Sequence, residues 1–299
     1  MKRIFCLLAL GAGIAISLYS LEIDSEMGWD NARFDRDRTT SLASDEAFVP
    51  QGALYWSIDL KENVGENFRI RFGYDRGALL RDRIETAFGV EYDIFSVYAG
   101  PFFAPFVSPE KPLGSGLTTE LKLRLPGILF VSLRNDTSLG SGLTLTGDFY
   151  QANSVLEAGF WVPNVIISAR VSLEEFIDKL NASDIANDRR IRYEFVTNFH
   201  KKNVPYTIEL RLGYQESSRS LSIAGVESAD ILHTLLTALK LSAQVHRKAQ
   251  VHLGGEFYPV TWTNGGMLPP AASTPLFTVS GGLQLSLPSI VKQSATRAD

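Results

Sequence analysis

The sequence has few residues that could form disulfides or bind metals. Its single cysteine, Cys6, is close to the N-terminus, and its histidines are scattered as His200, His233, His246 and His252. A disulfide framework needs several cysteines, and a zinc site needs cysteine or histidine ligands at short spacings. The sequence therefore predicts no metal site, and we expect no cofactor.

The sequence also lacks a large excess of charge of one sign. The formal net charge is −4, hydrophobic residues make up 45% of the chain and charged residues 21%. Nucleic-acid-binding proteins usually carry a basic surface, so this balance argues against nucleic acid as a partner. The composition is close to that of folded globular proteins, which argues against disorder.

Long apolar runs are missing outside the N-terminus. There, Lys2 and Arg3 precede an apolar stretch over 4–16 that small residues follow. This order is typical of a secretory signal peptide, and the stretch is shorter than the roughly 20 residues of a transmembrane helix. We expect 1–20 to be a cleaved signal peptide, with an anchor helix as the alternative. Cleavage would remove Cys6, which excludes disulfides and thiol catalysis, and two basic residues, which lowers the net charge from −4 to −6.

Beyond that segment, apolar and polar residues alternate. The stretch "NFRIRFGYD" over 67–75 has large apolar side chains at every second position, with Arg69, Arg71 and Gly73 between them. Strict period-two alternation predicts β-strands with two different faces. At ~9–11 residues for each membrane strand, we count about fourteen segments, within a range of about twelve to sixteen. They are 21–29, 53–60, 67–75, 83–91, 94–104, 118–125, 128–135, 154–162, 165–173, 190–199, 205–214, 232–243, 249–260 and 276–287.

The connections between these segments alternate between short turns and longer polar stretches, as in an up-and-down antiparallel meander. A short helix is one option within 172–186, and 228–240 is a second candidate because Ser228 suits a helix N-cap. No shift in composition divides the chain, so we expect one barrel domain over 21–288 and a polar tail over 289–299. The longer connections include 31–49, 136–152, 174–189, 216–229 and 261–275.

Two-faced strands occur in soluble β-sandwiches and in membrane β-barrels. Glycine is frequent on the charged face, which suits a crowded, curved inner wall. Aromatic residues on the apolar face gather near strand ends, and two aromatic girdles are typical of outer-membrane barrels. We therefore predict an all-β fold, a closed up-and-down antiparallel transmembrane β-barrel, with a periplasmic sandwich as the alternative. The girdle residues are Phe68, Tyr92, Phe199 and Tyr206 beside the short turns, and Trp29, Tyr74, Tyr193 and Tyr214 beside the long connections.

The last segment, "LFTVSGGLQLSLP" over 276–288, carries a specific order of residues. Ser280 is followed two positions later by Gly282, and then by Leu285 and Leu287. This order resembles the terminal targeting signal of bacterial outer-membrane β-barrels, although no aromatic residue closes the strand and a polar tail follows. The resemblance is to porin-like barrels of diderm bacteria, spirochaetes among them, and no single named family is matched. It implies outer-membrane localisation, contact with outer-membrane lipid and insertion by the barrel-assembly machinery.

In such a barrel the charged side chains face the lumen, because an arginine facing lipid at the midplane costs about 2–4 kcal/mol. Neighbouring strands would bring Arg192 and Glu194 close to Glu209 and Arg211, where ion pairs can form. The charges either form separated rings that tune solute passage or neutralise one another and stiffen the wall. The pore-lining candidates are Asp24, Glu26, Asp59, Arg69, Arg71, Arg83, Glu85, Lys122, Arg124, Arg134, Arg170, Arg192, Glu194, Glu209 and Arg211.

About fourteen strands leave a lumen wider than that of a packed eight-strand barrel. The leading hypothesis is therefore a channel for passive or facilitated passage of small solutes. An enzyme is not expected, because a nucleophile and a base must lie within hydrogen-bond reach and only His233 is near the outer rim, facing lipid. The alternatives are an adhesin or structural barrel with long surface loops, and a transporter of hydrophobic substrates gated by "PFFAPFVSP" over 101–109. A plug formed by 31–49 is a further option.

Overall fold

The computed structural model describes residues 20–33, 51–64, 66–76, 83–105, 113–138, 149–179, 185–201, 203–223, 226–263, 266–267 and 276–288. The expected signal peptide, up to residue 19, and the polar tail over 289–299 lie outside these residues. So does the plug candidate from residue 34 onward. Every element within the described residues is a β-strand, and no helix there is long and apolar enough to cross a membrane.

The strands form one antiparallel sheet that closes on itself. The described residues form fifteen strands, and β14 has only two residues, which leaves fourteen in the wall. Each of the fourteen predicted segments overlaps one of these strands, so the barrel prediction is confirmed. The strands are β1 (Ser20–Arg33), β2 (Gln51–Asn63), β3 (Phe68–Arg76), β4 (Arg83–Glu91), β5 (Phe95–Pro105), β6 (Leu113–Leu125), β7 (Leu129–Ser138), β8 (Phe149–Val162), β9 (Val165–Lys179), β10 (Ile185–His200), β11 (Tyr206–Ile223), β12 (Val226–His246), β13 (Ala249–Thr263), β14 (Gly266–Met267) and β15 (Leu276–Pro288).

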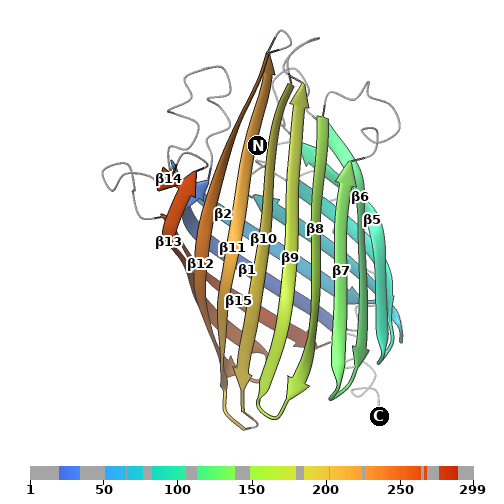
Figure 1. Ribbon diagram of the computed structural model, residues 1–299. Helices are drawn as coiled ribbons and strands as arrows, with labels where there is room; N and C mark the ends of the chain where they lie inside the picture. Colours follow the sequence, from blue (N-terminus) through green and yellow to red (C-terminus); the bar gives the residue numbers. More distant parts are fainter. Residues whose placement is uncertain are drawn as a thin grey trace, which may run out of the picture.

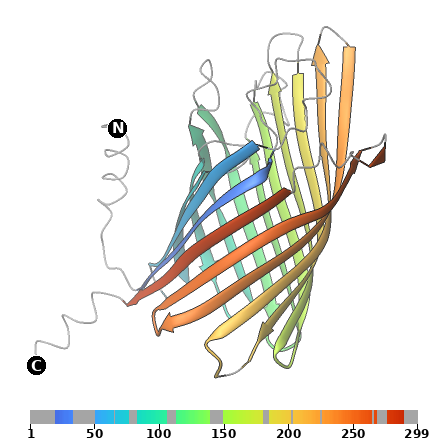
Figure 2. The ribbon, with the colours of Figure 1, turned by 90° about the vertical axis from the view of Figure 1, so that its left-hand side faces the viewer.

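The first and last strands close the barrel. β1 pairs with β15 from Ser20 opposite Pro288 to Asp30 opposite Thr278. Figure 2 shows these strands side by side, in blue and dark red, and Figure 1 shows the tight turns at the lower end of the wall. β1 therefore begins, and β15 ends, at the end of the barrel that carries the short turns. In outer-membrane barrels short turns face the periplasm.

Several strands are longer at the opposite end than the sequence predicts. β11 has 18 residues and β12 has 21, and they rise above the rest of the wall in Figure 1. The predicted loops over 174–189 and 216–229 are wrong for most of their length, and so is the helix candidate over 228–240. The helix option within 172–186 is wrong as far as Lys179, the end of β9. The sequence there is mostly polar and lacks strict alternation, while the backbone ladder of β11 and β12 continues to Ile223 opposite Val226.

A β-bulge in β13 reverses which residues face outward. Leu235 of β12 pairs with Val260, whereas Thr237 pairs with Phe257, so the register shifts by one residue between them. The shift includes Pro259, which lacks a backbone N–H to donate to a ladder. The pairing of β13 with β15 ends at Tyr258, before the bulge. Beyond the bulge, β13 pairs on that edge with the two-residue β14. Figure 2 shows β13 leaving the wall at this point.

The outer face of the barrel is apolar. Leu54, Leu212 and Leu253 expose 59–70% of their surface, as do many other large hydrophobic residues of this face to a lesser extent. Charged residues that alternate with them, such as Arg71, Glu120 and Glu194, are buried inside the barrel. An apolar band of this kind is what a barrel presents to acyl chains.

Candidate functional site

The pore-lining candidates divide into groups around the inner wall. Arg69 lies near the short-turn end, with its Nε 3.3 Å from Glu91 Oε2, and Arg124 is exposed near the same end. Asp24 lies directly opposite Asp59 on the neighbouring strand. The other candidates belong to two clusters of ion pairs, on β3–β7 and on β8–β13, and to a smaller group around Glu26.

The first cluster fills the β3–β7 side of the lumen. Arg71 pairs with Glu85 at 2.8 Å and with Glu120, and Arg83 pairs with Asp136 at 2.8 Å and with Glu85. These five side chains expose between 0% and 8% of their surface, so they are buried against one another although they line a lumen. Arg134 and Lys122, which are more exposed, complete the cluster by pairing with Glu85 and with Glu120.

Glycines allow bulky side chains to lie flat against this wall. Gly116 lies opposite Phe102 and Gly89 lies opposite Tyr98 on the adjacent strand. A Cβ added at Gly116 would lie 2.2 Å from the Phe102 ring, and one at Gly89 would lie 2.4 Å from the Tyr98 ring. Both rings are buried, so this side of the lumen is packed. Phe102 was part of the predicted apolar gate, and the structure places it in this packed wall.

The second cluster lies on β8–β13. Arg211 contacts Glu256 at 2.8 Å, Glu194 at 3.1 Å and Glu209 at 3.3 Å. Arg170 pairs with Glu157 at 2.9 Å. Arginines and carboxylates alternate within this cluster as they do in the first, so the described residues do not form separated rings of opposite charge.

Arg192 reaches further around the wall than its neighbours in the second cluster. It bonds to Gln215 Oε1 at 2.9 Å, to the Tyr258 hydroxyl at 3.1 Å and to Glu256 at 3.4 Å. The predicted pairing of Glu194 with Arg211 is present, but the ion-pair partner of Arg192 lies on β13 rather than on β11. Sequence reasoning missed Gln215 and Tyr258, since neither carries a charge. The bulge after Tyr258 also lies where alternation breaks down.

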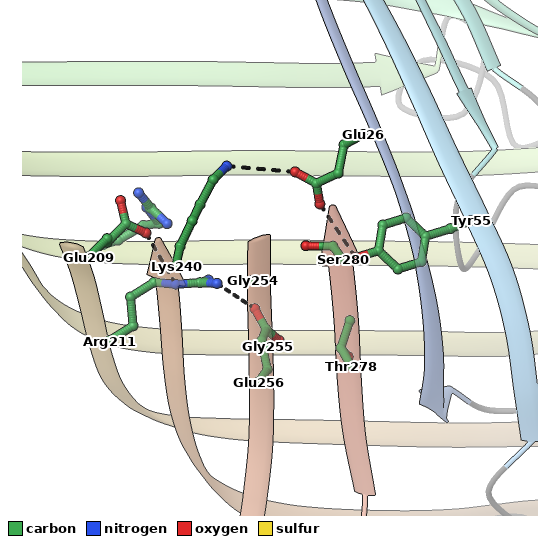
Figure 3. Close-up of a pocket in the computed structure, with 11 residues that line it drawn as sticks. Glu26, Tyr55, Glu209, Arg211, Lys240, Gly254, Gly255, Glu256, Thr278 and Ser280 are labelled. Atoms are coloured by element: carbon green, nitrogen blue, oxygen red, sulfur yellow. Dashed lines mark hydrogen bonds and ion pairs between the residues drawn. The ribbon is translucent and has the colours of Figure 1, made fainter. Parts of the chain in front are cut away.

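A third group joins the closing strands to β12 and β13. Glu26 on β1 lies 3.1 Å from His252 Nε2, 3.4 Å from the Tyr55 hydroxyl and 3.7 Å from Lys240 Nζ. Lys240 extends from β12 toward Glu26 over strands that carry Gly254 and Ser280 (Figure 3). The wall beneath this pair is therefore built from small residues.

A cavity of about 280 Å³ lies between this group and the second cluster. Its charged lining consists of Glu26, Glu209, Glu256, Arg170, Arg211 and Lys240. Tyr55 on β2 and Arg170 on β9 both line it, although these strands are seven steps apart around the fourteen-strand wall. The cavity therefore spans the lumen from one side to the opposite side.

The outer face carries aromatic residues near both ends of the strands. Phe68, Tyr92 and Tyr206 are exposed near the short turns, where the girdle was expected. Toward the other end, His233 stacks on Trp262 at 5.5 Å and on Tyr214 at 6.0 Å, and its Nδ1 lies 2.7 Å from the Tyr214 hydroxyl. His233 thus belongs to an outward-facing aromatic stack, and it does not point into the lumen.

No protein-family model matches the chain, and no curated protein sequence matches it. Solved structures do match its fold. An outer membrane channel from Pseudomonas putida F1 is 8% identical, with a TM-score of 0.52 over 91% of this chain and 96% of the channel. An anion-selective porin from Comamonas acidovorans is 9% identical, with a TM-score of 0.38 over 91% of this chain and 99% of the porin.

The fold is that of outer-membrane channels. At such identities the likeness shows the architecture alone, and the solute must be argued from this chain's own lumen. Among the described residues, no group of three or more histidine, cysteine, aspartate or glutamate side chains is arranged to hold a metal ion. The interior offers instead arginine, lysine and carboxylate groups around a cavity of small-molecule size.

Proposed function

We propose that the protein is an outer-membrane channel for small polar solutes, and that solutes pass along the β13–β15–β1 side of its lumen. The observation that supports this proposal is the cavity whose lining comes from opposite sides of the barrel. Its walls are charged and its floor includes Gly254, Thr278 and Ser280. A wet, charged lumen favours polar solutes over apolar ones, since burying a charge against an apolar molecule is unfavourable.

The two sides of the lumen differ in how much space they leave. On the β3–β7 side, Phe102 and Asp136 are completely buried. On the closing side, Gly254, Thr278 and Ser280 line the cavity together with Tyr55 and Lys240, while His252 and Tyr258 of β13 are buried beside it. Passage along the closing side therefore requires no rearrangement of the packed cluster.

Planar-bilayer recording tests this proposal. The refolded protein should give stepwise ion currents, and neutral sugars of increasing size should enter liposomes only while they are small. Gly254→Phe should reduce the unit conductance by at least about half, because the ring would occupy the cavity. Pore-lining groups determine which solutes a channel admits. Leu253→Phe is the matched control, because Leu253 is 68% exposed on the outer face.

Three outcomes would count against this proposal or a part of it. A folded, heat-modifiable barrel that gives no current would exclude passage through the lumen. Equal conductance in the Gly254→Phe and Leu253→Phe proteins would place the path elsewhere. Loss of a hydrolytic activity on substitution of His233 would favour an enzyme instead.

We further propose that the chain reaches the outer membrane through a cleaved signal peptide and the barrel-assembly machinery. Ser280 lines the lumen cavity and Gly282 shares its face of β15, whereas Leu285 and Leu287 share the opposite face, which supports this proposal. Replacing both leucines with asparagine should reduce the assembled, heat-modifiable fraction in cells. Edman sequencing of the mature N-terminus would locate the cleavage site.

A further inference from the structure

The cavity in the lumen has a balanced set of charges. Its lining has three carboxylates, from Glu26, Glu209 and Glu256, and three cations, from Arg170, Arg211 and Lys240. A solute with a single charge would be attracted by one set and repelled by the other. A solute that carries one positive and one negative group can satisfy both sets at once, and charge-assisted hydrogen bonds are the strongest that such groups can make.

The charged groups of this cavity differ in how closely they pair with one another. Arg211 is held by three carboxylates at 2.8–3.3 Å. Lys240 lies 3.7 Å from Glu26, beyond the 2.7–2.9 Å of a charge-assisted hydrogen bond. Figure 3 shows this pair stretched above the strands that carry Gly254 and Ser280. Lys240 is thus the cation of the cavity that a solute can most easily engage. Glu26 is the carboxylate beside it, and it also lies 3.1 Å from His252 Nε2 and 3.4 Å from the Tyr55 hydroxyl.

The surroundings of the pair fit a small polar molecule. The floor supplies the hydroxyl groups of Ser280 and Thr278, and Tyr55 supplies a further hydroxyl from the closing side. The volume of about 280 Å³ is below the range of about 300–1,000 Å³ of typical ligand pockets. The cavity therefore fits an amino acid with a small side chain or another molecule of similar size.

We propose that the cavity is a binding site for small zwitterions of amino-acid size, whose carboxylate pairs with Lys240 and whose ammonium group pairs with Glu26. This inference rests on the proposed channel function and names the class of solute that the channel binds. On entry the ligand replaces the long Lys240–Glu26 contact with two short ones, and it leaves the Arg211 cluster intact. Binding is weak enough for release because the site stays open to water within the lumen.

Block of ion current by added zwitterion tests the inference. Single-channel current through the wild-type protein is measured at a salt concentration of about 0.1 M, where exposed charges are not fully screened. β-Alanine is added as the probe, with propionamide as a neutral molecule of similar size. β-Alanine should reduce the current in a saturable manner at concentrations at least about tenfold lower than propionamide, since hydrogen bonds to charged groups are the stronger ones.

Three variants locate the site. Lys240→Met and Glu26→Gln should each weaken the block by β-alanine about tenfold. Lys122→Met is the matched control, because its side chain is 37% exposed against 33% for Lys240, and Lys122 lies on β6 outside the cavity. The double variant Glu26→Lys with Lys240→Glu keeps both charges and should restore the block.

The outcomes separate this inference from the channel function. Absence of ion current in the wild-type protein would remove the channel itself. Current that β-alanine blocks no better than propionamide would overturn the zwitterion site and leave the channel. Equal loss of block in Lys122→Met and Lys240→Met would overturn the location of the site.

Discussion

The guanidinium of Arg192 on β10 lies 3.4 Å from the carboxylate of Glu256 on β13, across two intervening strands. Arg134 on β7 reaches Glu85 on β4 at 2.7 Å over the same number of strands. Each contact therefore crosses two strands along the curved wall, and it links strands that share no backbone hydrogen bonds. The ion pairs therefore cross-link the barrel in addition to neutralising its interior.

Removal of Asp136 tests the stabilising role of the buried cluster. Its carboxylate is fully buried, accepts a hydrogen bond from Thr118 and pairs with Arg83 at 2.8 Å. Asp136→Ala should lower the free energy of unfolding by about 3 kcal/mol, because it leaves Arg83 with one fewer partner in a buried site. Urea titration of the refolded protein in detergent or lipid, followed by tryptophan fluorescence, measures the change.

Glu174 provides the comparison for that variant. Its side chain is 32% exposed, and it pairs with Arg190 at 3.3 Å near the long-connection end. Glu174→Ala should cost less than about 1 kcal/mol, because water screens the charge of a carboxylate that is partly exposed. Similar losses for Asp136→Ala and Glu174→Ala would mean that burial does not strengthen the cluster.

The glycine opposite Phe102 should be sensitive to the smallest enlargement. A Cβ at position 116 would lie 2.2 Å from the Phe102 ring and 2.5 Å from the Thr137 carbonyl oxygen. Gly116→Ala should therefore cost about 1–3 kcal/mol of unfolding free energy through overpacking. Gly255→Ala is the control, because its nearest neighbour would be 3.5 Å away, and it should change stability by less than about 0.5 kcal/mol.

A double-mutant cycle identifies the cause of that loss. Part of the cost of Gly116→Ala should disappear in a Phe102→Ala background, where the ring no longer occupies the space. The contact with the Thr137 carbonyl would remain. A cost that is unchanged by removal of the Phe102 ring would assign the sensitivity of Gly116 to the contact with the Thr137 carbonyl oxygen.

Alternation along the chain predicted the closed barrel, because each membrane strand must place apolar side chains in lipid and polar ones in the lumen. It also placed Glu194 beside Arg211, which are on neighbouring strands, and the structure pairs them at 3.1 Å. It did not predict the Arg192–Glu256 contact, because spacing along one strand carries no information about the curvature that brings β10 and β13 together. Pairing across several strands depends on that curvature.

The sequence also failed to predict strand extent and side-chain facing where its two-residue alternation breaks down. At the upper ends of β11 and β12 the sequence is mostly polar on both faces, so no alternation marks the strands. The bulge at Pro259 reverses the facing of later residues, so simple alternation would direct Trp262 inward, whereas it stacks on His233 outside. These features arise from strand pairing, which local patterns do not specify.

The assignment of faces can be tested with adjacent residues of β7. Leu133 is 43% exposed on the outer face, whereas Ser132 faces inward and lies opposite Lys122 and Glu157. Leu133→Arg should lower the free energy of unfolding in lipid vesicles by about 2–4 kcal/mol, because the charge would face acyl chains. Ser132→Arg should cost clearly less, and a larger loss for Ser132→Arg would reverse the assignment of the two faces.

Ion selectivity should respond to charge in the cavity more than to charge in the packed cluster. Lys240→Glu changes the cavity lining from three cations and three carboxylates to two cations and four carboxylates. The reversal potential in a potassium chloride gradient should therefore shift toward cation selectivity, since rings of charged side chains set which ions enter a pore. Lys122→Glu introduces the same change of charge on β6, away from the cavity, and should shift the potential less.

The difference between the two variants should shrink at high salt, where the Debye length falls to about 3 Å at 1 M. Equal shifts in the two variants would mean that ions pass along the β3–β7 side as readily as along β13–β15–β1.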